Sequence, residues 1–146
     1  MTGWNLVLAA HLLAVTAWVG GMFYALAVLR PSLAVLEPPQ RMALHLQAFR
    51  RFFLVVWHAM PIALLTGYAM LFGVYGGFRG APWPVHAMQA TGLVMAAVFL
   101  AIVFGPYRAL KAQPGPGPLD RIRRLITVNL ALGVLTITVA SFAHWG

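Results

Sequence analysis

The sequence has no cysteine and very little charge. Of its 146 residues, two are acidic and only 8% are charged. Without cysteine, disulfides, thiolate metal sites and covalent c-type haem attachment are excluded. Soluble chains carry about 25% charged residues, so these few charges are too sparse to cover the surface of a soluble domain. The chain is instead 62% hydrophobic, which excludes intrinsic disorder and indicates an integral membrane protein.

Long apolar runs divide the chain. A membrane-spanning helix needs about 20 apolar residues. We therefore predict an all-α fold, a four-helix membrane bundle in a single transmembrane domain, with spans at about residues 4–29, 52–75, 84–107 and 122–145. The steps Arg30–Pro31 and Pro38–Pro39 predict breaks in the first connection. The proline-rich run Gln113–Pro118 predicts an extended, non-helical linker in the third connection.

The basic residues predict the orientation of the bundle. Nine of the ten Lys and Arg residues flank the first and third connections, and one, Arg79, lies in the second. The positive-inside rule therefore places both termini outside. We expect a multi-pass protein of the inner membrane of a bacterium, with both termini in the periplasm. A net charge of +8 raises nucleic acid as a partner. However, basic clusters at the ends of apolar segments are typical of contact with a lipid bilayer, so we expect no nucleic-acid binding.

The histidines are the ionisable candidates for a functional site. No Asp or Glu lies within the four predicted spans, which argues against a carboxylate proton relay. Ionisable groups in a span are costly and therefore point to function. The candidates in the outer half of the spans are His11, His86 and His144, whereas His58 falls in the inner half and His45 in the first connection. The alternatives are that such a histidine only bonds to a neighbouring helix, that His144 is interfacial and that His45 is solvated.

Neutral imidazoles in an apolar bundle suit haem iron, which takes axial histidine ligands and has a large apolar ring. Arg79 and Trp83 are placed to meet the haem propionates, and Trp18 shares the helix face of the first-span histidine. Copper is the alternative, because it accepts histidine and methionine ligands. The pair His86 and Met88 cannot chelate one ion, however, since side chains two residues apart on a helix point in different directions.

Three segments resemble the CopD-like and HemJ-like membrane proteins. The first has His11, then Trp18 and Gly20–Gly21; the second is Phe49–Gly67, with a basic start, Pro61 and Thr66–Gly67; the third is Trp83-Pro-Val-His86. The resemblance implies a four-helix membrane fold with His11 and His86 as the functional histidines. For HemJ-like proteins it also implies b-type haem and protoporphyrinogen oxidation, and for CopD-like proteins copper uptake.

Two departures from the HemJ-like pattern argue against the oxidase activity. Residues 27–31 replace a Pro-Arg-Leu step, and Met88-Gln89 stands where those proteins have a lysine. The leading hypothesis is therefore a membrane b-type cytochrome in which His11 and His86 ligate iron, with His58 or His144 as replacements. Two histidine ligands saturate the iron and favour electron transfer with a redox partner. A porphyrinogen oxidase, a copper-handling protein and a cofactor-free assembly subunit are the alternatives, and the exposed bundle surface suits a homodimer.

Overall fold

The computed structural model describes residues 2–145, and side chains for residues 3–143. Within residues 2–145, helix is the only regular secondary structure. By length and composition, four helical stretches could cross a membrane, at Gly3–Val35, Pro38–Gly73, Trp83–Ala112 and Pro116–Ala143. The prediction of an all-α chain with four membrane-spanning helices is confirmed.

Six α-helices make up these four stretches. They are α1 (Thr2–Tyr24), α2 (Arg30–Ser32), α3 (Pro38–Gly73), α4 (Trp83–Phe104), α5 (Pro106–Ala112) and α6 (Pro116–Trp145). A π-helical turn at Ala25–Leu29 joins α1 to α2, and a 3-10 turn at Leu33–Val35 follows α2. The helix is interrupted between α4 and α5 at Gly105, which has a non-helical backbone conformation, and α5 begins at Pro106.

Of the two helix breaks predicted in the first connection, the one at Arg30–Pro31 is absent. The helix continues through Arg30–Pro31, because the preceding turn widens and the Arg30 amide bonds to the carbonyl of Ala25, five residues back. A wider turn relieves the clash between a proline ring and the carbonyl four residues earlier. The helical run ends at Leu36, whose ψ of 153° is extended. The predicted break before Pro38–Pro39 is confirmed.

Helix α3 is much longer than its predicted span. Its 36 residues reach roughly 54 Å at about 1.5 Å per residue, whereas a bilayer core is about 30 Å thick. The helix begins after Glu37, which forms a capping box with Gln40. The basic segment 41–51 is therefore continuous with the span, and several turns of α3 extend beyond an apolar layer.

Helix α6 also begins earlier than predicted, at Pro116. The expectation of a non-helical run through Pro118 was wrong for its second half. Pro116 and Pro118 stand in the first turn of the helix, where backbone amides have no intrahelical partner. Proline is therefore tolerated there, although it would break a helix interior.

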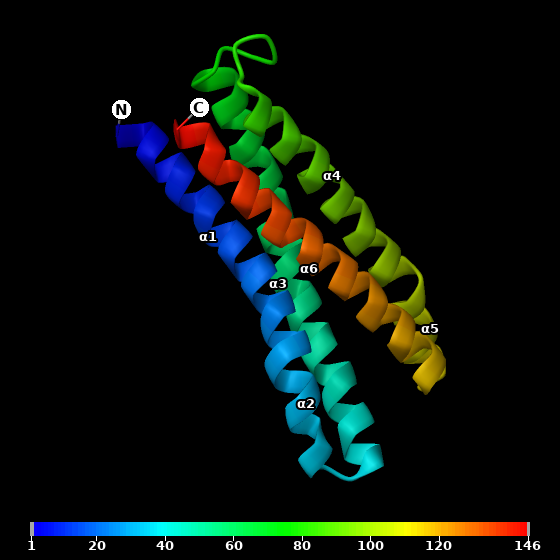
Figure 1. The fold of residues 1–146 in the computed structure, drawn as a ribbon. Coiled ribbons are helices and arrows are strands. Elements are labelled where there is room, and N and C mark those ends of the chain that lie inside the picture. The colour runs from blue at the N-terminus through cyan, green and yellow to red at the C-terminus, as the bar shows by residue number, and fades with distance from the viewer. Residues whose placement is uncertain (1, 146) are drawn as a thin grey trace.

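The two ends of the bundle differ in what they carry (Figure 1). The start of α1, the end of α6 and the loop 74–82 lie at one end, which we call the terminal end. The connection between α2 and α3, and helix α5, lie at the other, which we call the basic end. The two basic connections thus share one end, as the predicted topology requires. Which side of the membrane each end faces stays a prediction.

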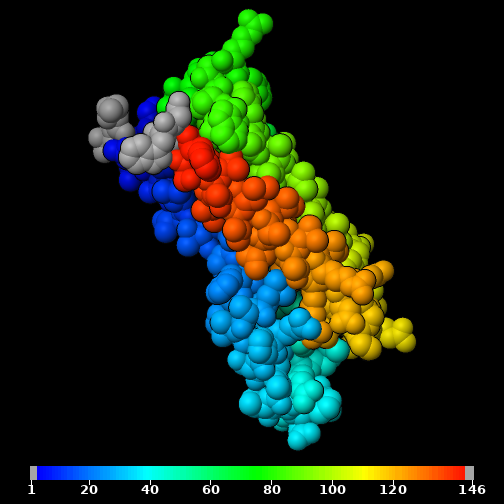
Figure 2. All heavy atoms as spheres, in the orientation of Figure 1, coloured from blue at the N-terminus to red at the C-terminus, as the bar shows by residue number. Residues whose placement is uncertain are grey.

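The four long helices pack as two pairs. Helix α1 lies mainly against α3, and α4 mainly against α6, while α6 also touches α1. In Figure 2, α6 runs along the visible face with α1 and α4 on its two sides. Gly133 permits this approach, because a Cβ there would lie 2.8 Å from Val19 Cγ2 and 3.3 Å from Met95 Cε.

The core is apolar and partly aromatic. Its members include Trp18, Met22, Val56, Met95 and Ile102. Toward the basic end, Phe53 contacts the rings of Phe99 and Tyr107 edge-on, at 5.9 and 4.8 Å between centroids. Many large apolar side chains face outward, among them Leu6, Leu13, Leu65 and Phe142. An outward apolar surface is what a lipid-embedded bundle requires.

Candidate functional site

His11 is fixed where α1 packs against α3. Its Nδ1 lies 2.9 Å from the carbonyl oxygen of Ala63 and 2.9 Å from Thr66 Oγ1. A carbonyl only accepts, so Nδ1 carries the proton and donates. The Thr66 hydroxyl donates to the Ile62 carbonyl, which leaves its oxygen as an acceptor for His11. The neutral ring therefore keeps its lone pair on Nε2.

The backbone of α3 holds the other side of this ring. Gly67 has no side chain, and a Cβ there would lie 3.2 Å from His11 Cε1. The imidazole thus fits against α3 and is half-buried. Metal-binding histidines commonly donate their second ring N–H to a carbonyl, which fixes the tautomer and the orientation. His11 already has this arrangement, with Nε2 available as a ligand.

Two methionines share the face of α3 that meets His11. Met60 and Met70 stand three residues before Ala63 and three after Gly67, so a helix of 3.6 residues per turn aligns all four positions. Met60 is buried and Met70 half-buried. Thioether sulfur is a soft ligand that suits Cu(I), as imidazole also does. The spacing of these methionines on one helix is visible in the sequence, but no sequence pattern connects them with His11.

His86 belongs to the other helix pair. It is exposed on α4, and α4 packs against α6 whereas α1 packs against α3. Trp83, 62% exposed, lies beside Phe142 with 6.1 Å between ring centroids. Arg79 is exposed in the loop 74–82. Trp18, by contrast, is 3% exposed and belongs to the core, so these predicted cofactor contacts are spread over several parts of the bundle.

The remaining span histidines are less suited to a shared site. His58 is exposed on α3, and its Nδ1 donates to the Leu54 carbonyl of the same helix at 2.8 Å. The side chain of His144 lies outside the described residues. Among the residues that the structure describes, no three His, Asp or Glu side chains come together as a metal site. A metal at His11 would therefore need ligands of another kind.

His45 is not the solvated residue that the sequence predicted. It is only 6% exposed, and its ring stacks on Phe49 with 5.5 Å between centroids. That expectation was wrong because His45 lies where the segment 25–34 and the N-terminal part of α6 meet α3. No periodic pattern in the sequence indicates that the helical run continues past Arg30 and covers this part of α3.

The comparisons with known proteins give one family. The copper resistance protein D (CopD) family matches residues 46–143, which cover most of α3 and α6 and all of α4 and α5, but not α1 with His11. The curated proteins and the solved structures gave no match. The match spans more than half of the chain, and together with the four apolar helices it identifies a multi-pass membrane protein. The predicted CopD-like resemblance is confirmed, and the chain belongs to the copper resistance protein D family.

Proposed function

We propose that this protein handles copper within the membrane and holds Cu(I) as cargo where α1 meets α3. The observation that carries the proposal is the hydrogen bond from His11 Nδ1 to the Ala63 carbonyl at 2.9 Å. This bond leaves the Nε2 lone pair in a neutral ring between two apolar helices. The name of the family, copper resistance protein D, supports copper over other metals.

Each residue has a distinct role in this proposal. His11 is the nitrogen ligand, and Ala63 and Thr66 orient its ring. Met60 and Met70 lie ten residues apart on the same face of α3, about 15 Å along its axis, so one of the two supplies thioether sulfur to the ion at His11. All these ligands are neutral, so a monovalent ion adds less buried charge than a divalent one. This favours Cu(I) over Zn²⁺, whose sites are usually completed by thiolate or carboxylate ligands.

The test is an anaerobic competition for Cu(I) between the purified protein in detergent and a chromophoric chelator. We expect the protein to retain one Cu(I). The variant His11→Leu should bind about 100-fold more weakly, because even the removal of a partner that orients a ligand costs about 10–100-fold. The double variant Met60→Leu/Met70→Leu should also weaken binding, by a smaller factor.

The matched control is His58→Leu. His58 is also a span histidine with Nδ1 bonded to a carbonyl, but it is exposed on α3 and its partner belongs to its own helix. We expect this variant to bind Cu(I) as the unaltered protein does. Equal affinities for the unaltered protein, His11→Leu and His58→Leu would contradict the proposal.

A b-type cytochrome with electron-transfer activity is the second candidate. The orientation of the His11 ring favours it, since an axial haem ligand also profits from an N–H donated to a carbonyl. The fit is partial, because the proposed second ligand His86 is exposed on α4, which packs against α6 and not mainly against α1. Haem would supply a one-electron redox couple. A Soret band in the same preparation that is lost in both His11→Leu and His86→Leu would favour haem over copper.

A further inference from the structure

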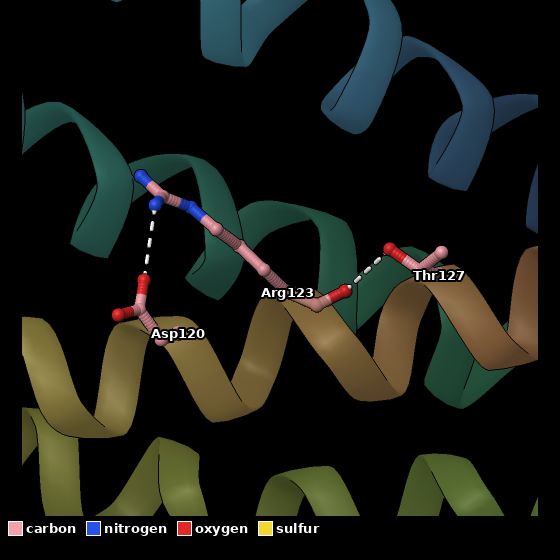
Figure 3. Close-up of polar contacts among 3 residues, drawn as sticks. All are labelled: Asp120, Arg123 and Thr127. Carbon is pink, nitrogen blue, oxygen red and sulfur yellow. Dashed lines mark hydrogen bonds and ion pairs between the residues drawn. The ribbon is translucent and has the colours of Figure 1, made fainter.

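A cavity of about 390 Å³ lies at the basic end. It is a partly open cavity lined by residues of the segment 26–34 and of the N-terminal turns of α3 and α6. Its polar wall consists of Arg30, Arg41, His45 and Arg123, and its apolar wall of Leu26, Pro31, Leu33 and Ala34. In Figure 3, the Arg123 side chain extends from α6 toward α3. The volume falls within the range of about 300–1,000 Å³ typical of small-ligand pockets.

The charge around this cavity is positive and largely uncompensated. Three guanidinium groups line it, and Asp120 meets only one of them, with 3.2 Å between Asp120 Oδ1 and Arg123 Nη1. The Asp120 side chain is 56% exposed, so solvent screens this ion pair. Glu37, the other acidic residue, forms the capping box of α3. The cavity therefore favours an anion.

Two buried nitrogen atoms in the cavity wall have no hydrogen-bond partner. They are Nδ1 of His45 and Nε of Arg123. His45 is only 6% exposed, and Arg41 is held in place by a bond from its Nε to the Leu36 carbonyl at 2.7 Å. Buried polar atoms in folded proteins are almost always paired. Unpaired nitrogens in the wall of a cationic cavity point to a ligand with oxygen acceptors.

We propose that Arg30, Arg41, Arg123 and His45 form a binding site for a phosphate group at the basic end of the bundle. Guanidinium forks match the oxygens of phosphate in a bidentate manner and remain charged at any physiological pH. The basic end is the one that the positive-inside rule places at the cytoplasmic leaflet, where anionic phospholipids attract arginine. The same chemistry would hold free phosphate. This site is independent of the copper centre proposed above.

The test uses the delipidated protein in a neutral detergent and three probes. Phosphatidylglycerol carries an anionic phosphate head group, inorganic phosphate supplies the same group without a lipid, and dioleoylglycerol is a lipid without phosphate. Retained ligand is measured by native mass spectrometry, and the thermal midpoint by tryptophan fluorescence. Binding and stabilisation by phosphatidylglycerol alone would identify the lipid as the source. Stabilisation by inorganic phosphate would identify the free ion, and dioleoylglycerol should have no effect.

Substitutions of the lining arginines test whether the phosphate probe binds in this cavity. We expect Arg123→Gln and Arg30→Gln each to weaken binding of the effective probe about tenfold, as the loss of a charge-assisted hydrogen bond does. The matched control is Arg124→Gln, which removes the same charge from the next, exposed position of α6 and should bind as before. If Arg123→Gln does not fold, Arg30→Gln decides, because Arg30 forms no ion pair within the described residues. Equal weakening in Arg124→Gln and Arg30→Gln, or no binding of either phosphate probe, would overturn the proposal.

Discussion

His11 and His45 are both enclosed by helices, but they lie toward opposite ends of the bundle and have different neighbours. At His11, Nδ1 donates to the Ala63 carbonyl and to Thr66 Oγ1, and no charged side chain among residues 3–143 forms a hydrogen bond or ion pair with the ring. At His45, Nδ1 has no partner, and three arginines line the same cavity. The first environment prepares a lone pair for a cation, and the second prepares donors for an anion. The partners of the ring, more than the residue type, set what a buried histidine binds.

The pair α4–α6 shows what a purely structural polar contact looks like in the same bundle. Thr136 donates to Thr91 at 2.6 Å, and Asn129 Nδ2 donates to the Met95 carbonyl at 3.2 Å. These bonds cross the contact between the two helices, while Oδ1 of Asn129 is buried without a partner among the described residues. Polar groups that pair in this way hold two helices together, whereas His11 is oriented by its partners and still has a nitrogen lone pair to offer.

The largest expected effect concerns which side of the membrane each end faces. Because the chain has no cysteine, single cysteines report their position without a background. We expect Arg79→Cys to react with a membrane-impermeant thiol reagent in intact cells. Gln113→Cys should react only after the membrane is permeabilised, because its connection carries five basic residues and is predicted to be cytoplasmic. The reverse pattern would place His45 outside and His11 toward the cytoplasm.

A smaller effect is expected from a change beside His11. In Gly67→Val, the added Cβ would meet His11 Cε1 at 3.2 Å and Nδ1 at 3.7 Å, so the branched side chain displaces the ring from Ala63. We expect Cu(I) affinity to fall about tenfold, as for other changes that disturb the orientation of a ligand. The measurement is the same chelator competition.

The control for this change is Gly92→Val on α4. A Cβ at Gly92 meets nothing within 4 Å, so this variant adds the same side chain to a span without touching His11. Copper affinity should stay unchanged in Gly92→Val. An equal loss in both variants would mean that the effect of Gly67→Val is a general disturbance of the bundle.

The smallest effect is expected at His45. In His45→Phe, the stacking on Phe49 is retained while the unpaired buried nitrogen is removed. In phosphate-free detergent we expect the free energy of unfolding to rise by about 1 kcal/mol, since an unsatisfied buried polar group costs about 1–3 kcal/mol. Binding of the phosphate probe should weaken in the same variant.

Denaturant titration followed by tryptophan fluorescence measures this change in stability, with His58→Phe as the control. His58 is exposed and its Nδ1 is already bonded to the Leu54 carbonyl, so His58→Phe should bring no gain. A loss of stability in His45→Phe would show that the His45 ring has a partner in the folded protein, and the contrast between the two histidines would then disappear.

Particular residues show how far sequence reasoning reached. The four apolar runs predicted the four long helices, and Pro38–Pro39 predicted the break before α3. The predictions of a helix break at Arg30–Pro31 and of a non-helical run at residues 116–118 were wrong, because proline is compatible with a helix after a widened turn or within the first turn. At the candidate site, His11 was singled out by its position in a span. Thr66 was named only as part of the family-like segment and Ala63 was not named. Neither was paired with His11, since both lie more than 50 residues away in the sequence.

The sequence by itself determined that the chain is helical and membrane-embedded. Its long apolar runs carry few charges and therefore suit lipid, and a helix that crosses lipid satisfies its backbone hydrogen bonds within its own segment. It also determined the basic bias of the connections, which sets the expected topology. Tertiary structure decided which nitrogen of His11 carries the proton, which methionines share its face of α3, and that His45 is buried among arginines. These features depend on which helices pack against each other, and the apolar periodicity of a span leaves that choice open because lipid and neighbouring helices are equally apolar.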